Sequence, residues 1–146
     1  MVWKPNVTVA AIVERDGRFL LVEENTSQGV RLNQPAGHLE SGETLIGAIK
    51  REVLEETAYI FEPKFTTGIQ LWTKGPNDTT FLRVVFTGIV GQFFEERQLD
   101  TGIIQTVWLT PKEIMNAKHK LRSPLVLSCV TDYLSGHIFP LSVIRP

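Results

Sequence analysis

The sequence predicts an α/β protein in which helices pack on a mixed β-sheet. Segments rich in β-branched residues come before, between and after the helix-like segments, a pattern that favours a sheet covered by helices. The chain has 146 residues, of which 42% are hydrophobic, so it can bury a core and is too apolar to be disordered. No internal repeat or linker interrupts it, and we expect residues 1–146 to form a single domain.

The first part of the chain predicts a hairpin followed by irregular chain. Residues 6–14 (NVTVAAIVE) are rich in β-branched side chains and predict a strand. Asp16-Gly17 is typical of a two-residue hairpin turn, so residues 18–24 are expected to return as a second strand. The polar stretch 25–35 predicts a loop. The proline and glycines of 35–43 (PAGHLESGE) predict further turns in the chain.

The rest of the chain alternates between strands and helices. Thr44 offers an N-cap for a helix that runs to about Thr57. The later elements are bounded by turn residues, by Pro111 or by Gly136; they are strands at 60–74, 79–91 and 103–110, and helices at 111–120 and 123–136.

Composition and charge exclude several classes of function. The net charge of −1 gives no argument for binding a nucleic acid polymer, and no apolar run approaches the roughly 20 residues that span a bilayer. The first residues lack the layout of a signal peptide. Cys129 is the only cysteine, so no internal disulfide forms, and a buried apolar role suits it better than a nucleophilic one. We therefore expect a cytoplasmic protein.

The helix predicted at 44–57 carries carboxylates where a helix disfavours them. On a helical wheel Glu52, Glu55 and Glu56 border the apolar stripe instead of occupying the opposite face. Like-charge neighbours cost about 0.2–0.5 kcal/mol per pair, and anions in the last turns cost about 0.3–1 kcal/mol each. Arg51 offsets only part of this, so a solvated acidic surface explains the cluster poorly.

A bound cation would compensate these charges. Three oxygen-bearing side chains on adjacent turns suit a hard divalent ion, Mg²⁺ or in its place Mn²⁺. The glycines of segment 35–43 would let its backbone approach the same ion closely. A Mg²⁺ ion held by carboxylates commonly works on phosphate groups, so the sequence indicates metal-dependent phosphate chemistry on a small molecule.

The segment from Gly37 to Tyr59 resembles the Nudix box. The fixed positions of the box that this chain matches are Gly37, Glu43, Arg51, Glu52, Val53, Glu55 and Glu56. The departures are Ala58, where the box has a glycine that resembles a left-handed helix cap, and Tyr59 in place of an aliphatic residue. Segments outside the box, KPNVTVAAIV, LNQPAGHLE, FLRVVF and LRSPLV, are similar to the NudJ branch of this family.

The resemblance implies a fold, an activity and roles for single residues. The family fold is an α/β/α sandwich around a mixed sheet, and its members cleave diphosphate linkages by attack of water at phosphorus. Glu52, Glu55 and Glu56 would hold the metal with the backbone carbonyl at Ala36-Gly37. Arg51 would orient the glutamates, and Glu43 would hold the loop or contribute to the metal shell through water.

The catalytic group implied by the resemblance comprises Glu55, Glu56 and Arg51. The general base stays open between a glutamate of the box and an acid of the later loop, which offers Glu95, Glu96 and Asp100.

Substrate recognition is predicted from cationic and aromatic side chains. Arg31, Arg83 and Arg122 are candidates for phosphate, and Arg83 stands out because it lies in an apolar strand. The candidates for stacking on a ring are Phe81, Trp72 and Trp3, and His38 is a further candidate for phosphate. A core or surface position is the plain alternative for each. The NudJ branch has tryptophan where this chain has Leu32, which predicts weaker stacking at that position.

The substrates implied by the branch are nucleoside tri- and diphosphates, hydroxymethylpyrimidine diphosphate and thiamine diphosphate. Two other functions share the family fold. A non-catalytic nucleotide-sensing module would have lost acids of the box, which this chain keeps. An isopentenyl diphosphate isomerase would need a cysteine at the active site, and Cys129 falls in the last helix. We expect a monomer or a homodimer.

Overall fold

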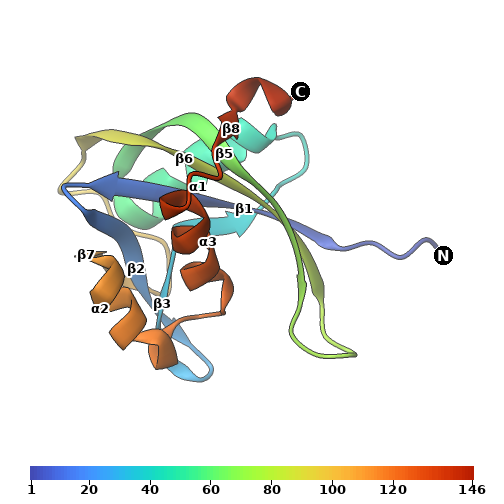
Figure 1. The fold of residues 1–146 in the computed structure, drawn as a ribbon, viewed down its shortest axis with the longest axis horizontal. Coiled ribbons are helices and arrows are strands. Elements are labelled where there is room, and N and C mark those ends of the chain that lie inside the picture. The colour runs from blue at the N-terminus through green and yellow to red at the C-terminus, as the bar shows by residue number, and fades with distance from the viewer.

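The computed structural model describes residues 1–146 and contains one eight-stranded sheet with helices on both faces (Figure 1). The strands are β1 (Asn6–Arg15), β2 (Arg18–Thr26), β3 (Gly29–Asn33), β4 (Ala36–His38), β5 (Tyr59–Thr73), β6 (Thr80–Phe93), β7 (Ile103–Leu109) and β8 (Phe139–Pro140). The α-helices are α1 (Leu45–Thr57), α2 (Pro111–Asn116) and α3 (Leu125–Leu134). Two 3₁₀ turns, η1 (Lys118–Lys120) and η2 (Leu141–Val143), complete the structure.

The sheet is mixed because one pair of strands runs parallel. The main order is β3-β2-β1-β6-β5-β8, with β4 on β1 and β7 on β2. β1 runs parallel to β6, and the other pairs are antiparallel. Thr8 of β1 is in register with both His38 of β4 and Arg83 of β6, and Arg83 is in register with Gln70 of β5. Four strands therefore bring one row of polar residues together.

The two faces of the sheet bury two separate cores, which follow from the alternation of side chains along a strand. On β1, Val9, Ala11 and Val13 pack in the core beneath α1. Ala10 and Ile12 point the other way, into the core beneath α2 and α3. A strand buried on both faces reads as a continuous apolar run, as residues 9–13 do. The result is the α/β/α sandwich that the sequence predicted.

Several boundaries predicted from the sequence are wrong. Residues 29–33 form an edge strand paired with β2 instead of a loop, and residues 36–38 pair with β1. The alternation of Val30 and Leu32 with Arg31 and Asn33 was hidden among turn-forming residues, and three residues at 36–38 are too few to give a strand signal. The helix predicted at 111–120 ends at Asn116 and continues as a 3₁₀ turn, and the last helix is shorter than predicted. The two-residue strand β8 was not predicted.

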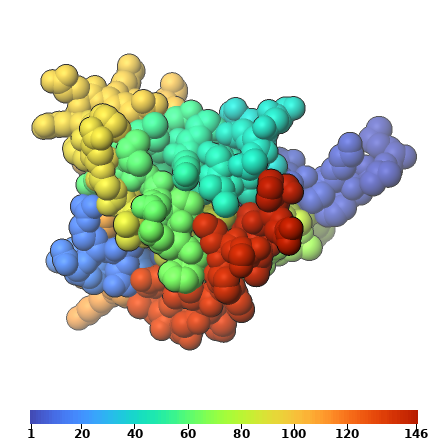
Figure 2. Space-filling model, turned by 90° about the horizontal axis from the view of Figure 1, so that it is seen from above, coloured from blue at the N-terminus to red at the C-terminus, as the bar shows by residue number.

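The two ends of the chain lie on the outside of the molecule. The first residues project away from the body of the protein, whereas the C-terminal residues lie against β5 (Figure 2). No helix combines the length and the apolar character needed to cross a bilayer.

Helix α1 begins and ends where the sequence predicted, through one cap at each end. The Thr44 hydroxyl accepts a hydrogen bond from the Gly47 backbone N–H at 3.0 Å, which satisfies a free donor of the first turn. Ala58 lies in the left-handed region with φ 62°, and its N–H donates to the Leu54 carbonyl. Strand β5 then starts at Tyr59, so this cap turns the chain directly from the helix into the sheet.

We predict that Ala58→Gly changes the free energy of unfolding by less than about 1 kcal/mol. Relief of the left-handed strain gains about 1–2 kcal/mol, but Ala58 is fully buried, and losing its methyl group and restricting a glycine cost about as much. Ala48→Gly in the same helix is the matched control, because Ala48 is equally buried and has no strain to relieve. In urea unfolding, the free energy of unfolding of the Ala48 variant should be about 1–2 kcal/mol lower than that of the Ala58 variant. Equal losses would mean that the left-handed cap stores no strain.

Candidate active site

The acidic end of α1 faces the sheet and lies against strand β4. Glu52 and Glu56 are buried, at 8% and 7% exposed, so the wheel placed them correctly toward the interior. Gly37 of β4 runs so close to the helix that a Cβ atom there would meet the Glu52 carboxylate at 2.1 Å. A side chain at residue 37 would displace the Glu52 carboxylate, whereas glycine lets the backbone approach it closely. The predicted meeting of segment 35–43 with the acidic helix is therefore present.

Arg51 holds most of the acidic cluster together. Its guanidinium donates to Glu43 through Nε and NH2 at 2.6 and 2.9 Å, to Glu52 at 2.8 Å and to Glu55 at 3.1 Å. It also donates to the His38 carbonyl at 3.0 Å. These charge-assisted bonds lower the pKa of Glu43, chiefly through the hydrogen bond from Arg51. Arg51 therefore offsets more of the negative charge than the sequence indicated, and it fixes the orientation of two box glutamates.

Glu56 receives no hydrogen bond from Arg51. Its Oε1 accepts from the Ala36 backbone N–H at 2.8 Å, which ties the end of α1 to β4. Burial raises the pKa of Glu56 to about 8, and the negative charge of Glu52 adds to the rise. Burial also raises the pKa of Glu52, against the opposing effect of Arg51. In the absence of a cation, Glu56 therefore holds a proton at neutral pH.

The structure adds Asp100 to the cluster. Carboxylate oxygens of Glu52, Glu55 and Asp100 all lie within 4.8 Å of one another, whereas Glu56 stands outside this group. The Asp100 N–H donates to the Glu55 carbonyl at 2.9 Å, so the loop after β6 is fixed to the helix end. Glu95 and Glu96 of the same loop are exposed. Among the acids of this loop that the sequence singled out, the fold places only Asp100 at the box.

These carboxylates suit a divalent cation by their chemistry. Three oxygen ligands converge from two chain segments at the edge of the interior, and the group has one arginine against four or more acids. Hard cations such as Mg²⁺ and Mn²⁺ prefer such oxygen ligands, and a bound cation would favour the charged form of Glu56. The cluster can therefore hold a metal and present it to a substrate.

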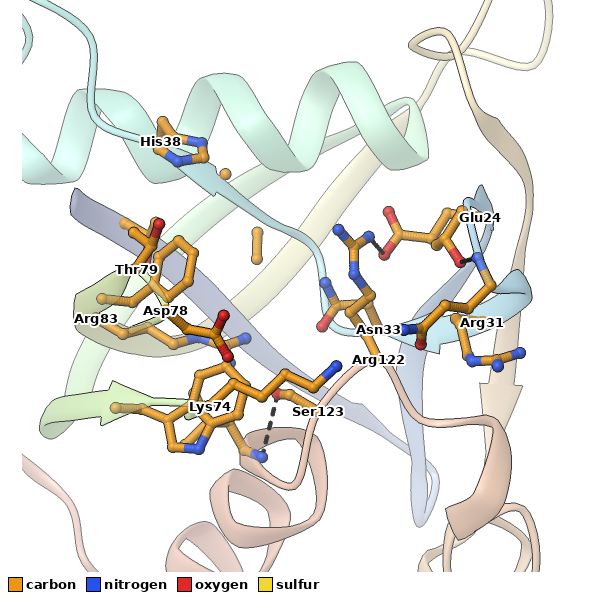
Figure 3. A pocket seen from close by; sticks show the side chains of 18 of the residues that line it. Glu24, Arg31, Asn33, His38, Lys74, Asp78, Thr79, Arg83, Arg122 and Ser123 are labelled. Carbon is orange, nitrogen blue, oxygen red and sulfur yellow. Dashed lines mark hydrogen bonds and ion pairs between the residues drawn. The ribbon is translucent and has the colours of Figure 1, made fainter. Parts of the chain in front are cut away.

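A cavity of about 660 Å³ lies beside this cluster, at the end of the sheet where β4 meets the β2–β3 hairpin (Figure 3). Ala36 and Gly37 of β4 line one side of it, so its wall is the same strand that touches Glu52 and Glu56. The β2–β3 hairpin, the tip of the β5–β6 hairpin and the segment before α3 supply the remaining walls. The three arginines and the aromatic residue Phe81 that the sequence proposed for substrate all line it, as do His38 and Trp72.

The aromatic residues of the cavity stand on two paired strands. Phe81 of β6 and Trp72 of β5 are in register, with ring centroids 6.4 Å apart and planes inclined by 25°. His38 lies 6.3 Å from the Phe81 ring. The near-parallel Phe81 and Trp72 rings offer a surface on which a planar group can stack, and the His38 ring is inclined to Phe81 by 59°. Trp3, the third aromatic candidate, is two-thirds exposed on the projecting N-terminus and lines no part of the cavity.

Leu32 does not line this cavity, so the structure gives no support to the prediction that it weakens ring stacking. On β3, Arg31 and Asn33 point into the cavity, and the alternation of the strand sends Leu32 to the opposite face. There Leu32 is buried in the core beneath α2 and α3. Its substitution would change packing and not the recognition of a ring.

The chain belongs to the Nudix family, because a family model of the NUDIX domain matches residues 3–128. It is a Nudix hydrolase, an enzyme that acts on phosphoanhydrides. The phosphatase NudJ of Escherichia coli K12 is 40% identical over 142 residues, which cover 97% of this chain and 92% of NudJ.

Solved structures agree with this assignment. A NUDIX hydrolase from Nitrosomonas europaea is 49% identical, with a TM-score of 0.95 over 98% of this chain and 97% of its own. The NUDIX domain of Shewanella oneidensis NrtR, solved with ADP-ribose, is similar in fold alone, with 15% identity and a TM-score of 0.70 over 92% of this chain and 89% of its own.

The raised pKa of Glu56 predicts that the metal-free protein loses stability between about pH 5 and pH 8. Its ordinary pKa is 4.5 and its folded pKa is about 8, so the folded state binds the proton more tightly. The stabilisation is complete below about pH 4.5 and is lost as the pH rises through about 8. We expect urea unfolding in EDTA to show a decrease of a few kcal/mol over this range.

Glu56→Gln should remove most of this pH dependence, because the amide does not titrate. Glu52 acts in the same direction, so a smaller slope should remain in the variant. Glu43 has a lowered pKa, and its effect falls below pH 4.5, outside the range compared. A variant with the same slope as the parent protein would show that Glu56 is not the titrating group.

Proposed function

We propose that the enzyme is a metal-dependent hydrolase of small diphosphate and triphosphate compounds. The observation that carries this proposal is the position of the cavity: one β-strand, β4, separates its arginines and aromatic rings from the carboxylate cluster. No carboxylate of the cluster lines the cavity, but β4 is paired with β1 alone, so we propose that a phosphate chain reaches the cluster past the free edge of β4 while an attached ring lies on the aromatic residues. We also propose that the whole chain is one Nudix domain that works in the cytoplasm as a monomer or homodimer, without a nucleic acid polymer or membrane as partner.

The proposed roles divide the acids between holding a metal and moving a proton. Glu52, Glu55 and Glu56, with the backbone at Ala36-Gly37, hold the ion, and the position of Asp100 supports its joining them. When bound, Mg²⁺ or Mn²⁺ neutralises phosphate oxygens and favours ionisation of a water molecule.

The other residues of the box organise the acids. Arg51 keeps Glu52 and Glu55 oriented toward each other, and Glu43 clamps the loop through Arg51 and by accepting the Glu40 N–H at 2.9 Å. Glu56 holds a proton when no cation is near, so it can also accept one from water once its charge is stabilised. These contacts support a catalytic group of Glu55, Glu56 and Arg51. This group would activate a water molecule for attack at phosphorus.

The proposed substrates carry a single ring and a short phosphate chain. Phe81 and Trp72 offer one stacking surface, and Arg31, Arg83 and Arg122 offer positive charge. Nucleoside tri- and diphosphates, hydroxymethylpyrimidine diphosphate and thiamine diphosphate all have this form. A non-catalytic sensing module fits less well, since every acid of the box is present and gathered in space. An isomerase fits less well again, because Cys129 is fully buried.

A release assay tests the proposal. Purified protein is incubated with Mg²⁺, with Mn²⁺ or with EDTA, and with a panel of nucleotides, nucleotide sugars, dinucleoside polyphosphates, thiamine diphosphate and its pyrimidine precursor. We expect release of phosphate or pyrophosphate from several compounds with a single ring, and none in EDTA. Turnover that survives EDTA, or that is confined to dinucleoside polyphosphates, would contradict the proposal.

Glu52→Gln and Glu56→Gln should each abolish most turnover while the fold is retained. The loss of kcat/KM should exceed the roughly 10–100-fold that is typical of residues that only orient metal ligands. Glu52→Gln removes a repulsive neighbour and Glu56→Gln removes the cost of protonating a buried carboxylate at neutral pH, so the metal-free variants should unfold at an equal or slightly higher urea concentration. Near-normal turnover in either variant would refute the metal assignment for that residue.

Phe81→Leu should weaken the binding of ring-bearing substrates and leave the binding of inorganic pyrophosphate unchanged. The stacking surface of an aromatic ring is worth about 0.5–1.5 kcal/mol beyond burial, which corresponds to roughly a threefold to tenfold increase in KM. Leu32→Trp, buried on the other face, is the matched comparison and should lower stability without improving the KM of ring-bearing compounds. A parallel change for pyrophosphate in Phe81→Leu would show that the residue acts on the shape of the cavity.

A further inference from the structure

The cavity contains a buried guanidinium without a carboxylate partner. Arg83 lies on β6 and is 94% buried, since only 6% of its surface is exposed, yet it lines the cavity. No ion pair of the structure involves it. Its one side-chain hydrogen bond runs from NH2 to the Gln34 Oε1 at 2.9 Å. The guanidinium has five N–H donors, so most of its donors are free of protein partners.

The residues in register with Arg83 are neutral, and the acids that line the same cavity, Glu24 and Asp78, form no ion pair with it. Thr8 and Gln70 flank it in register on β1 and β5, and Cys129 lies beneath it in α3. Burial raises the pKa of the Cys129 thiol, which donates to Gln70 at 3.4 Å and so brings no negative charge. Arginine stays protonated at any physiological pH even where burial lowers its pKa. A full positive charge is therefore held in the cavity wall without compensation from the protein.

Gln34 fixes the direction of this charge. It is 1% exposed and directly follows β3, where its Nε2 lies 3.5 Å from the Ala11 carbonyl. Its backbone N–H is held in turn by the Asn33 side chain at 2.9 Å. A neutral amide orients a guanidinium without neutralising it, whereas a carboxylate would do both. This choice of residue keeps Arg83 rigid and still attractive to an anion.

We infer that Arg83, positioned by Gln34, is the specificity-determining residue that binds an oxyanion of the ligand in this cavity, at a point separate from the carboxylate cluster. The inference deepens the proposed function, on which it rests for the nature of the substrate. The oxyanion group is a phosphate or pyrophosphate, and the adjoining Phe81 and Trp72 rings accept the planar part of the same compound. Recognition then requires an anion at Arg83 as well as a phosphoanhydride at the cluster.

The other arginines of the cavity do not have this property. Arg122 is paired with Glu24 at 2.7 Å, which already compensates its charge. Arg31 is less buried and donates to the Val30 carbonyl at its own strand. A charge in water is largely screened, but a buried one acts at close to full strength on a neighbouring anion. Arg83 is therefore the arginine whose removal should change affinity most.

The test is calorimetric titration of the metal-free protein with inorganic pyrophosphate in EDTA, at constant salt. The parent protein should bind, Arg83→Gln should bind at least tenfold more weakly, and Arg18→Gln should match the parent. Arg18 is the matched control because it is an exposed arginine outside the cavity, paired with Glu113. Absence of binding by the parent at millimolar pyrophosphate, or equal binding by Arg83→Gln, would overturn the inference.

Gln34→Glu is the second variant, and it separates anion binding from a structural role. This variant keeps Arg83 and the volume of residue 34 but supplies a carboxylate partner for Arg83. The affinity for pyrophosphate should fall at least tenfold, and circular dichroism should show that the protein remains folded. A merely structural Arg83 would leave the affinity of this variant unchanged, which would overturn the inference. With a turned-over substrate, both variants should raise KM more than they lower kcat.

The calorimetric result is independent of the proposed function. If the panel of phosphate compounds shows no metal-dependent turnover, the proposed hydrolase function fails, and the binding of pyrophosphate without metal still decides the role of Arg83. If turnover is found and the affinities of Arg83→Gln and Gln34→Glu equal that of the parent, the hydrolase function stands and the role of Arg83 fails.

Discussion

The candidate site depends on the balance of charge at the end of α1. Five carboxyl groups gather there, and one guanidinium, that of Arg51, is hydrogen bonded to Glu43, Glu52 and Glu55. Without Arg51 these groups would repel each other by more than a helix end tolerates. With Arg51 they are held in place but not fully neutralised. Glu56 has no cationic partner and holds a proton. The remaining negative charge is what makes the cluster attractive to a cation.

The same charges constrain the fold around them. Glu56 is satisfied only because β4 presents the Ala36 N–H to it, and Glu52 fits only because residue 37 has no side chain. β4 is held on β1, which is buried on both faces and paired with β6. The central strand thus fixes the strand that touches the acids, and the left-handed cap at Ala58 returns the chain to the sheet directly after them. Stability and the candidate chemistry share these contacts.

How far the sequence predicts this arrangement depends on the range of the interactions. Local signals were enough for the limits of α1, because Thr44 and the box position at Ala58 act within one turn. The burial of Glu52 and Glu56 followed from helical periodicity. Strand β3 was missed because Val30 and Leu32, which alternate with Arg31 and Asn33, stand among turn-forming residues that indicated a loop.

Contacts between distant segments were the hardest to predict. Asp100 was one of three equivalent acids in a loop until the fold placed it against the Glu55 carbonyl. Gln34 carried no sequence signal, because its role depends on a side chain 49 residues away.

Two guanidiniums in this protein show how environment decides the use of one residue type. Arg51 is surrounded by carboxylates and donates its hydrogen bonds to them, so it orients other groups of the protein. Arg83 is more deeply buried and has a neutral amide instead, which leaves its charge and most of its donors for a ligand. Evolution toward stability alone would favour a carboxylate at position 34, because an unpaired buried charge is costly. A bound anion would compensate the charge of Arg83 and offset this loss of stability. The site then has a negative cluster on one side of β4, which attracts a cation, and a positive wall on the other, which attracts an oxyanion, and only a compound that satisfies both neutralises it.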